Sequence, residues 1–157
     1  MISQTKNIEL VRPLFEQYMW DMKQYVEIED LQAWKKGASE YLSLYGSEPE
    51  RSIYMLSISK FEQSGFALVN RSYRFNNTGS VMSQFYISPE NQSQGLGRVL
   101  ANHIFAEHPG EWEVCVISAN TIGFQFWESV ISTYTKGRYS VQSKADYNGH
   151  GFTFESA

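Results

Sequence analysis

A glycine loop between a strand-like segment and a helix-like segment constrains the fold of this chain most. Residues 81–87 are rich in side chains that suit a strand, and residues 92–98 read Gln-Ser-Gln-Gly-Leu-Gly-Arg. From residue 96 onwards apolar side chains recur at i, i+3, i+4, i+7 and i+8, which predicts a helix. A second strand is predicted at residues 112–117. The order strand, loop, helix, strand is that of one right-handed unit with two parallel strands.

The loop is also the segment where we expect chemistry. Gly95 and Gly97 remove two side chains at the start of the helix, so that a ligand can approach bare backbone. The first amides of a helix have no internal partner, and the helix dipole adds positive potential there. A phosphate or pyrophosphate suits such a place, and Arg98 adds a cation nearby. The alternative is a tight turn whose glycines serve packing alone.

Two other nucleotide motifs fail on this loop. A P-loop needs Gly-Lys-Ser/Thr after its glycines, whereas residues 97–99 read Gly-Arg-Val. A dinucleotide fingerprint needs a third glycine three positions on, where this chain has Leu100. Neither family of nucleotide sites is therefore indicated.

The loop does resemble the acetyl-CoA signature of the GNAT N-acetyltransferases, Gln/Arg-x-x-Gly-x-Gly/Ala, through Gln92, Gly95 and Gly97. A second segment lies at the expected distance. Residues 120–127 read Asn-Thr-Ile-Gly-Phe-Gln-Phe-Trp, which is similar to the family pattern Asn-x-x-Ala-x-x-Phe-Tyr. Together with the run Gly-Glu-Trp-Glu-Val at residues 110–114, these motifs resemble a predicted acetyltransferase subgroup of that superfamily.

Composition sets the broad class of the protein. A chain of 157 residues predicts one domain, residues 1–157, and 42% hydrophobic with 15% aromatic residues predicts a globular fold. A net charge of −4 argues against nucleic-acid binding and mildly favours a cationic acceptor. The single cysteine, Cys115, cannot form an internal disulfide, which suits the cytoplasm. With no apolar stretch long enough to span a bilayer, we expect no membrane partner. We expect either a monomer or a homodimer.

The N-terminal half is predicted to hold two helices and a meander of three strands. Polar residues 1–7 are expected to fray, a helix follows from Pro13, and residues 31–45 fit a second helix. The strands are expected at residues 52–60, 66–70 and 81–87, with a hairpin turn at residues 62–65.

The C-terminal half is predicted to continue with a helix at residues 120–131, whose core face includes Ile122 and Phe126. A strand at residues 138–142 and a final strand at 152–155 would be joined by a tight turn at Asn148-Gly149. His103, on the apolar stripe of the preceding helix, is expected to be buried. The predicted fold is α/β, a mixed antiparallel and parallel sheet with helices on both faces. The resemblance, which covers residue 53 to the end and more faintly the N-terminal helices, implies the GNAT-like acyl-CoA N-acyltransferase fold.

The resemblance implies acetyl-CoA as donor substrate, with no metal. The residues that would bind it lie on the strand at residues 81–87, in the glycine loop and on the helix at residues 120–131. They are Phe85, Tyr86, Ile87, Gln92, Ser93, Gln94, Gly95, Leu96, Gly97, Arg98, Asn120 and Trp127. A backbone amide near Tyr86 or Ile87 would polarise the thioester carbonyl. Asn120 can equally be a simple helix N-cap, and Phe126 is expected to be core.

The chain departs from the family pattern at two catalytic positions. The subgroup often has Glu where Gln84 stands, and a glutamine cannot act as a general base. Many members have Tyr where Trp127 stands, and an indole N–H will not protonate the departing thiolate. Tyr86 and Tyr134 are candidate proton donors. Glu27, Glu29 or a water molecule could accept a proton. The candidate catalytic residues are therefore Gln84, Tyr86 and Tyr134, and the sequence does not choose among them.

Three functions are compatible with these residues. The first is acetyl transfer from acetyl-CoA to a primary amine of a small molecule, with Tyr25, Glu27 and Glu29 on the acceptor side. The second, motivated by Gln84 and Trp127, is a catalytically degenerate acetyl-CoA-binding sensor or interaction module. The third changes only the acceptor, to an amine of a protein or peptide. Proximity supplies much of the rate of such a transfer, so the first function is preferred.

Overall fold

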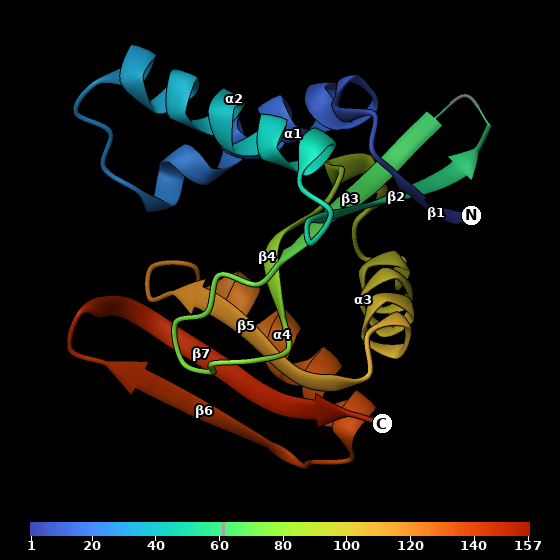
Figure 1. The fold of residues 1–157 in the computed structure, drawn as a ribbon, viewed down its shortest axis with the longest axis vertical. Coiled ribbons are helices and arrows are strands. Elements are labelled where there is room, and N and C mark those ends of the chain that lie inside the picture. Colours follow the sequence, from blue (N-terminus) through green and yellow to red (C-terminus); the bar gives the residue numbers. More distant parts are fainter. Residues whose placement is uncertain (61) are drawn as a thin grey trace.

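The computed structural model describes residues 1–60 and 62–157, and within them seven strands form one sheet in the order β1-β2-β3-β4-β5-β7-β6 (Figure 1). The strands are β1 Ile2–Thr5, β2 Ser52–Ser59, β3 Glu62–Asn70, β4 Ser80–Ile87, β5 Gly110–Ile117, β6 Tyr139–Lys144 and β7 Tyr147–Ser156. The α-helices are α1 Ile8–Met22, α2 Leu31–Ser47, α3 Leu96–Glu107 and α4 Thr121–Thr135. Two 3-10 turns, η1 Lys23–Tyr25 and η2 Pro89–Asn91, complete the described elements.

Helices cover both faces of the sheet, as predicted. On one face α1 and α2 pack against β2, β3 and β4 through Phe15, Leu42 and Phe66, which are buried. On the other face α3 and α4 pack against the sheet through Ile104 and Val130. Burial of each such side chain contributes roughly 1.5–3 kcal/mol, so the two apolar layers hold the helices in place.

The N-terminus is an edge strand, and the prediction that residues 1–7 fray is wrong. β1 pairs antiparallel with β2, from Ile2 opposite Leu56 onwards. The terminal ammonium donates a hydrogen bond of 2.7 Å to the carbonyl of Ser57. The partner strand lies some fifty residues away in the sequence, so the local polarity of the segment gave no sign of it.

Two glycines that were expected to mark turns lie inside strands instead. β3 already begins at Glu62, and Gly65 sits in it because a Cβ there would lie 2.7 Å from the carbonyl oxygen of Tyr86. Likewise β7 begins at Tyr147, and a Cβ at Gly149 would lie 2.4 Å from the carbonyl oxygen of Val116. The turns predicted at residues 62–65 and at Asn148-Gly149 are therefore wrong, since these glycines permit close approach of a neighbouring strand.

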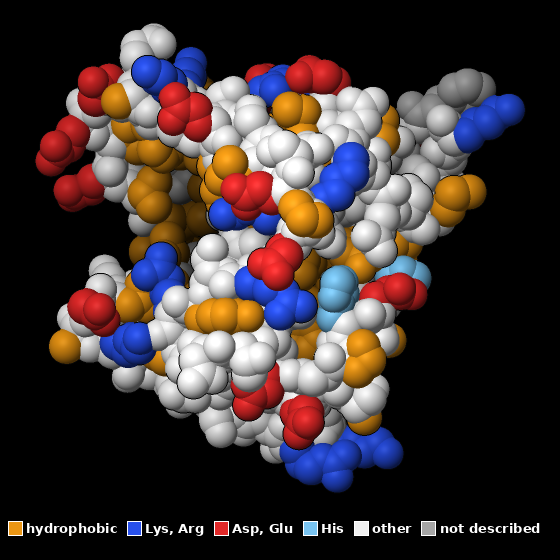
Figure 2. All heavy atoms as spheres, viewed as in Figure 1, with side chains coloured by type: hydrophobic (Ala, Val, Ile, Leu, Met, Phe, Trp, Pro, Cys, Tyr) orange, Lys and Arg blue, Asp and Glu red, His pale blue; other side chains and the backbone are white. Residues whose placement is uncertain are grey.

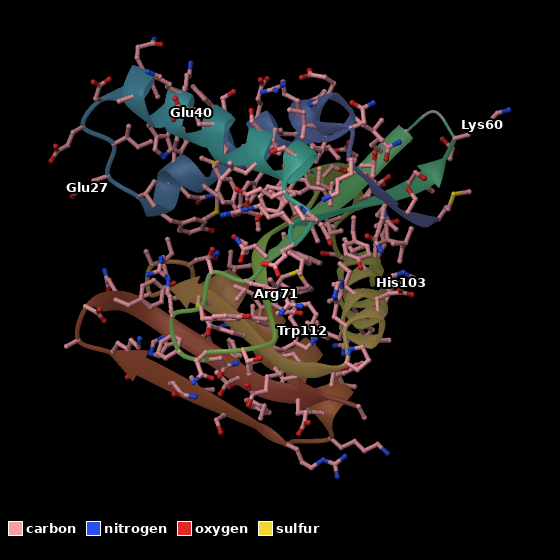
Figure 3. The ribbon with its side chains drawn as sticks, in the orientation of Figure 1. Glu27, Glu40, Lys60, Arg71, His103 and Trp112 are labelled. Atoms are coloured by element: carbon pink, nitrogen blue, oxygen red, sulfur yellow. The ribbon has the colours of Figure 1, made fainter. Side chains whose placement is uncertain are left out.

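Three outward side chains correct the predicted helix faces. Ile122 on α4 is 72% exposed and Val99 on α3 is 54% exposed, although both were placed on an apolar stripe. His103 is also exposed, with its ring centroid 6.2 Å from that of Tyr54, and Figure 3 shows it on the outer side of α3. The predicted burial of His103 is wrong because α3 turns Leu100, not His103, fully into the core.

The sheet divides where β4 and β5 meet. They pair in parallel at only three positions, from Ser80 opposite Trp112 to Met82 opposite Val114, and every other pairing is antiparallel. A bulge places Ser83 out of register with β3, and such bulges bend a strand. In Figure 1, β4 runs from the half that holds β5–β7 into the half that holds β1–β3. Beyond Met82 its edge towards β5 has no strand partner among the described residues.

Candidate active site

The divergence of β4 and β5 opens a cleft of about 1390 Å³ between the two halves of the protein. Figure 2 shows it as a deep hollow with hydrophobic side chains on its walls. The end of α1, the outer part of β4, the glycine loop and the start of α4 all line this cleft. The segments that were predicted to bind acetyl-CoA therefore meet in one place.

The glycine loop ends in an uncapped helix. Gly95 is the N-cap of α3 with a φ of 78°, in the left-handed region, and no side chain caps the helix. The first bond of the helix runs from the amide of Val99 to the carbonyl of Gly95, at 3.2 Å. The amides of Leu96, Gly97 and Arg98 thus have no acceptor within the helix. Since Gly95, Gly97 and Arg98 line the cleft, the start of α3 brings unpaired N–H donors and the positive end of the helix dipole to it.

The polar side chains of the loop mostly support its shape. The side-chain amide of Gln92 donates to the carbonyl of Ile87 at 2.7 Å, which ties the loop to the end of β4. Ser93 has a φ of 65°, so the backbone turns sharply there, and Gln94 reaches back to the carbonyl of Glu90 at 3.4 Å. The side chains of Gln92 and Gln94 thus make hydrogen bonds to the backbone of the β4–α3 connection itself.

Arg98 offers a directed cation. Its Nη2 donates to the hydroxyl of Ser129 on α4 at 2.9 Å, while its Nη1 is buried without a hydrogen-bond partner among the described residues. A buried N–H without an acceptor costs free energy, so an anion at this place would be stabilised by it. Arg98 therefore brings an unpaired N–H group, as well as a positive charge, to the start of α3.

The start of α4 closes the cleft on the other side. A Cβ at Gly97 would lie 2.9 Å from the ring of Phe126, so this glycine lets the loop contact α4 directly. Phe126 is half-buried: it packs against the core, as expected, and it also lines the cleft. Trp127 is buried, with its ring centroid 4.8 Å from that of Phe85. Asn120 is the N-cap of α4 and accepts from the amide of Gly123 at 2.9 Å.

Hydrogen bonds between side chains join residues 83–86 of β4 to the helices α1 and α2. The hydroxyl of Tyr18 donates to Gln84, and that of Tyr41 lies 2.5 Å from the Ser83 hydroxyl. Tyr86 donates to the Asp21 carboxylate at 2.7 Å. Burial raises the pKa of the Tyr86 phenol, and its bond to Asp21 raises that pKa further. The phenol is therefore neutral and able to donate at ordinary pH.

Asp21 was missed by the sequence analysis. It lies near the end of α1, off the apolar stripe, where a charged side chain looks like ordinary solvent exposure. Its partner Tyr86 is 65 residues away, so nothing local marks it. The sequence signal that could have pointed to Asp21 is an acidic residue near the C-terminal end of the helix that packs against the strand at residues 81–87.

Some predicted site residues lie elsewhere. The hydroxyl of Tyr134 lies 2.7 Å from that of Ser156 and its ring packs against Phe105, so the structure puts it in the core and not among the described lining residues of the cleft. Glu27 and Glu29 are exposed, and Figure 3 shows Glu27 at the outer tip of the connection between α1 and α2. Tyr25, from the same segment, does line the cleft.

A buried carboxylate fixes the loop that joins β3 to β4. Glu113 on β5 is completely buried and accepts hydrogen bonds from the amides of Arg74, Phe75 and Asn76 at 2.7, 2.9 and 2.8 Å. Cys115, two residues on, has its pKa raised to about 12 by burial and by the Glu113 charge. Glu113 thus holds one wall of the cleft in place.

Comparison with known proteins rests on structure alone. No family model matches the chain, and no curated protein matches it. An acetyltransferase from Thermus thermophilus superposes with a TM-score of 0.71 at 15% identity, over 99% of this chain and 97% of the other. A GNAT-family acetyltransferase from Staphylococcus aureus gives 0.64 at 9% identity over 100% of both chains. A spermidine N-acetyltransferase mutant from Vibrio cholerae gives 0.64 at 9% identity over 99% and 95%.

The chain has the GNAT fold. The resemblance that the motifs indicated is thereby confirmed at the level of architecture, including the mixed sheet with its single parallel pair. Within the part of the chain that the structure describes, no group of three or more His, Cys, Asp or Glu side chains could hold a metal ion. No described helix is both long enough and apolar enough to cross a bilayer.

Proposed function

We propose that this protein is an acetyl-CoA-dependent N-acetyltransferase that acts on a primary amine of a small molecule. The observation that carries the proposal is the meeting of two features in one cleft. These are the uncapped start of α3, with its free amides, and the unpaired edge of β4. The GNAT fold of the solved acetyltransferases supports it.

The residues fit such a donor. The amides of Leu96, Gly97 and Arg98, together with the free Nη1 of Arg98, suit a pyrophosphate. The pantetheine arm would lie along residues 83–87 and bond to their free backbone groups, as an added strand does. Phe126, half-buried beside Gly97, would cover the arm. The thioester carbonyl would then lie near the amide of Tyr86 or Ile87, which stabilises developing oxyanion charge.

The reaction is a direct transfer between two bound substrates. The amine nitrogen attacks the thioester carbonyl carbon, the new C–N bond forms, and the C–S bond breaks. An acceptor that arrives as an ammonium ion loses two protons in all. The first passes through water to Asp21 and on to solvent before attack, and the second, released once the C–N bond has formed, ends on the thiolate. Tyr86, which is neutral beside Asp21, can relay this second proton. Gln84 is an amide and orients groups only.

The test begins with calorimetric titration of acetyl-CoA, followed by thiol release with a panel of amines. Binding with thiol release supports the proposal, and absence of acetyl-CoA binding overturns it. The amide at Gln84 and the indole at Trp127 favour one alternative, an acetyl-CoA-binding module without catalysis. Binding without thiol release for small amines and for peptides alike would favour that alternative. We also propose that the protein works in the cytoplasm, because its one cysteine has no second cysteine with which to form an internal disulfide.

A further inference from the structure

A second hollow, of about 290 Å³, lies between α1 and α2. Its walls are mainly apolar, and they include Phe15, Met19, Trp34, Gly37, Tyr41 and Gln84. Phe15 and Tyr41 stack with their ring centroids 6.4 Å apart, which gives the hollow a flat aromatic side. No carboxylate or ammonium group lines it among the described residues.

This hollow borders the large cleft at β4. Tyr41 and Gln84 line both spaces, so the two adjoin at these side chains, next to the strand where the acyl group would be transferred. The hydroxyl of Tyr41 is held by Ser83, and the side chain of Gln84 is held by Tyr18. The polar groups at the junction are thus satisfied, and the space beyond them is apolar.

Gly37 makes room in this hollow at a cost to its helix. It lies inside α2, where glycine is less favourable than alanine. A Cβ at Gly37 would meet nothing within 4 Å, in contrast to Gly97, where it would meet the ring of Phe126 at 2.9 Å. No neighbour therefore requires a glycine at position 37. What the missing side chain does is leave open volume beside Trp34 and Ala38.

We propose that the hollow between α1 and α2 binds the apolar group of the acceptor, so that the substrate class is a primary amine carrying an aryl or branched alkyl group. This inference rests on the proposed acetyltransferase function. A closed cavity of roughly 150 Å³ is enough to bind benzene, so this hollow, which is open to solvent at Ala33 and Gly37, has room for an aromatic ring with its linking carbons. An apolar group placed here leaves the amine at the mouth, beside Gln84 and β4. The exposed Glu27 and Glu29 lie outside both spaces, so recognition through a polycationic tail is not built into this site.

The experiment measures kcat/KM for three apolar amines, 2-phenylethylamine, tryptamine and isoamylamine, against ethanolamine and putrescine. The variants are Gly37→Ala, Gly37→Leu and, as a matched control, Gln32→Leu, which adds a leucine to an exposed position of α2 outside the hollow. Gly37→Ala adds one methyl group to open space and keeps the fold.

For the preferred apolar amine we expect Gly37→Leu to lower kcat/KM more than tenfold and Gly37→Ala to lower it less. Values for ethanolamine and putrescine, and the affinity for acetyl-CoA, should stay within twofold in every variant, and Gln32→Leu should change nothing. The inference is overturned if the apolar amines are no better substrates than ethanolamine. It is equally overturned if Gly37→Leu lowers kcat/KM for all amines alike.

The two proposals fail in different ways. Absence of acetyl-CoA binding by the unaltered protein sinks the acetyltransferase function itself. If acetyl-CoA binds but no amine is acetylated, calorimetric titration of the three apolar amines into the CoA-saturated protein decides the question. Binding that Gly37→Leu abolishes supports the hollow as their site, and absence of binding by all three rejects it.

Discussion

The phenol of Tyr86 donates a hydrogen bond of 2.7 Å to the carboxylate of Asp21 and so joins β4 to the end of α1. The ring centroids of Tyr86 and Tyr18 are 5.6 Å apart, and the hydroxyl of Tyr18 in turn donates a hydrogen bond to the side-chain oxygen of Gln84. Among the described cleft-lining residues the carboxylates are Asp21 and Glu113, and Glu113 is occupied by three backbone amides. Asp21 is therefore the carboxylate that can meet a cation in the cleft.

We predict that Asp21→Asn raises KM for the amine about tenfold or more, because a charged hydrogen bond contributes about 1.5–3 kcal/mol. The affinity for acetyl-CoA should not change, since Asp21 lies on the acceptor side. Steady-state kinetics and calorimetry measure the two effects. Glu16→Gln, the same change of charge at an exposed position of α1, is the control. Equal losses in both affinities would refute a role in amine binding.

Gln84→Glu places a carboxylate where the acceptor amine must lose its proton. We predict unchanged affinity for acetyl-CoA and a kcat that rises at least about tenfold, since a positioned base contributes typically 10²–10⁴. The pH profile of kcat should gain an acidic limb. Gln17→Glu, which is exposed on α1, should have no effect. A kcat that does not rise would indicate that water relays the proton without help from this position.

Gly97→Ala tests the contact between the glycine loop and α4. The new Cβ would lie 2.9 Å from the ring of Phe126, so either the ring or the start of α3 must shift. We predict that the affinity for acetyl-CoA falls about tenfold, or about 1.4 kcal/mol. Adding Phe126→Leu should recover part of it by making room. If the double variant binds no better than Gly97→Ala, the loss has another cause.

Glu113→Gln tests the attachment of the loop between β3 and β4. A glutamine accepts through one oxygen only, so at least one of the three backbone amides loses its partner, at a cost of about 2 kcal/mol. Urea unfolding should show this loss, and the amides of residues 74–76 should exchange hydrogen faster. Glu111→Gln, on an exposed position of the same strand, should stay within about 0.5 kcal/mol. Unchanged exchange would exclude the proposed attachment.

The raised pKa of Tyr54 predicts that the free energy of unfolding falls in alkali. Burial raises its pKa to about 12, and the nearby charge of Glu107 adds to that. In the unfolded chain the phenol ionises near its ordinary pKa of about 10. Its stabilising contribution is full below pH 10 and is lost as the pH rises towards 12, because the folded state then binds more protons than the unfolded state. Tyr54→Phe should reduce the loss of stability between pH 10 and pH 11 by about 1 kcal/mol, measured by urea unfolding at the two pH values.

At pH 8 the same variant should lose about 1 kcal/mol, because the hydroxyl of Tyr54 lies 2.7 Å from Nε2 of His108 and that bond disappears. An alkaline slope identical to that of the unaltered protein would mean that Tyr54 does not carry the effect.

The sequence predicted the features of this protein that depend on residues close together in the chain. Gly95, with its positive φ, and the free amides after it follow from a short motif at a helix start. Gly65 and Gly149 were misread as turn residues, because what requires them is the carbonyl of a neighbouring strand. The edge strand β1 and the bond from Tyr86 to Asp21 were missed for the same reason, since each depends on a partner far away in the sequence.

The short seam between β4 and β5 also has a mechanical meaning. With three paired positions, few interstrand hydrogen bonds join the two halves of the sheet, and one apolar core with residues from both halves makes the rest of the connection. A molecule that bonds along the free edge of β4 and also contacts α4 would add a second polar connection between the halves. The spacing of the walls that the acceptor meets would then depend on whether the donor is bound.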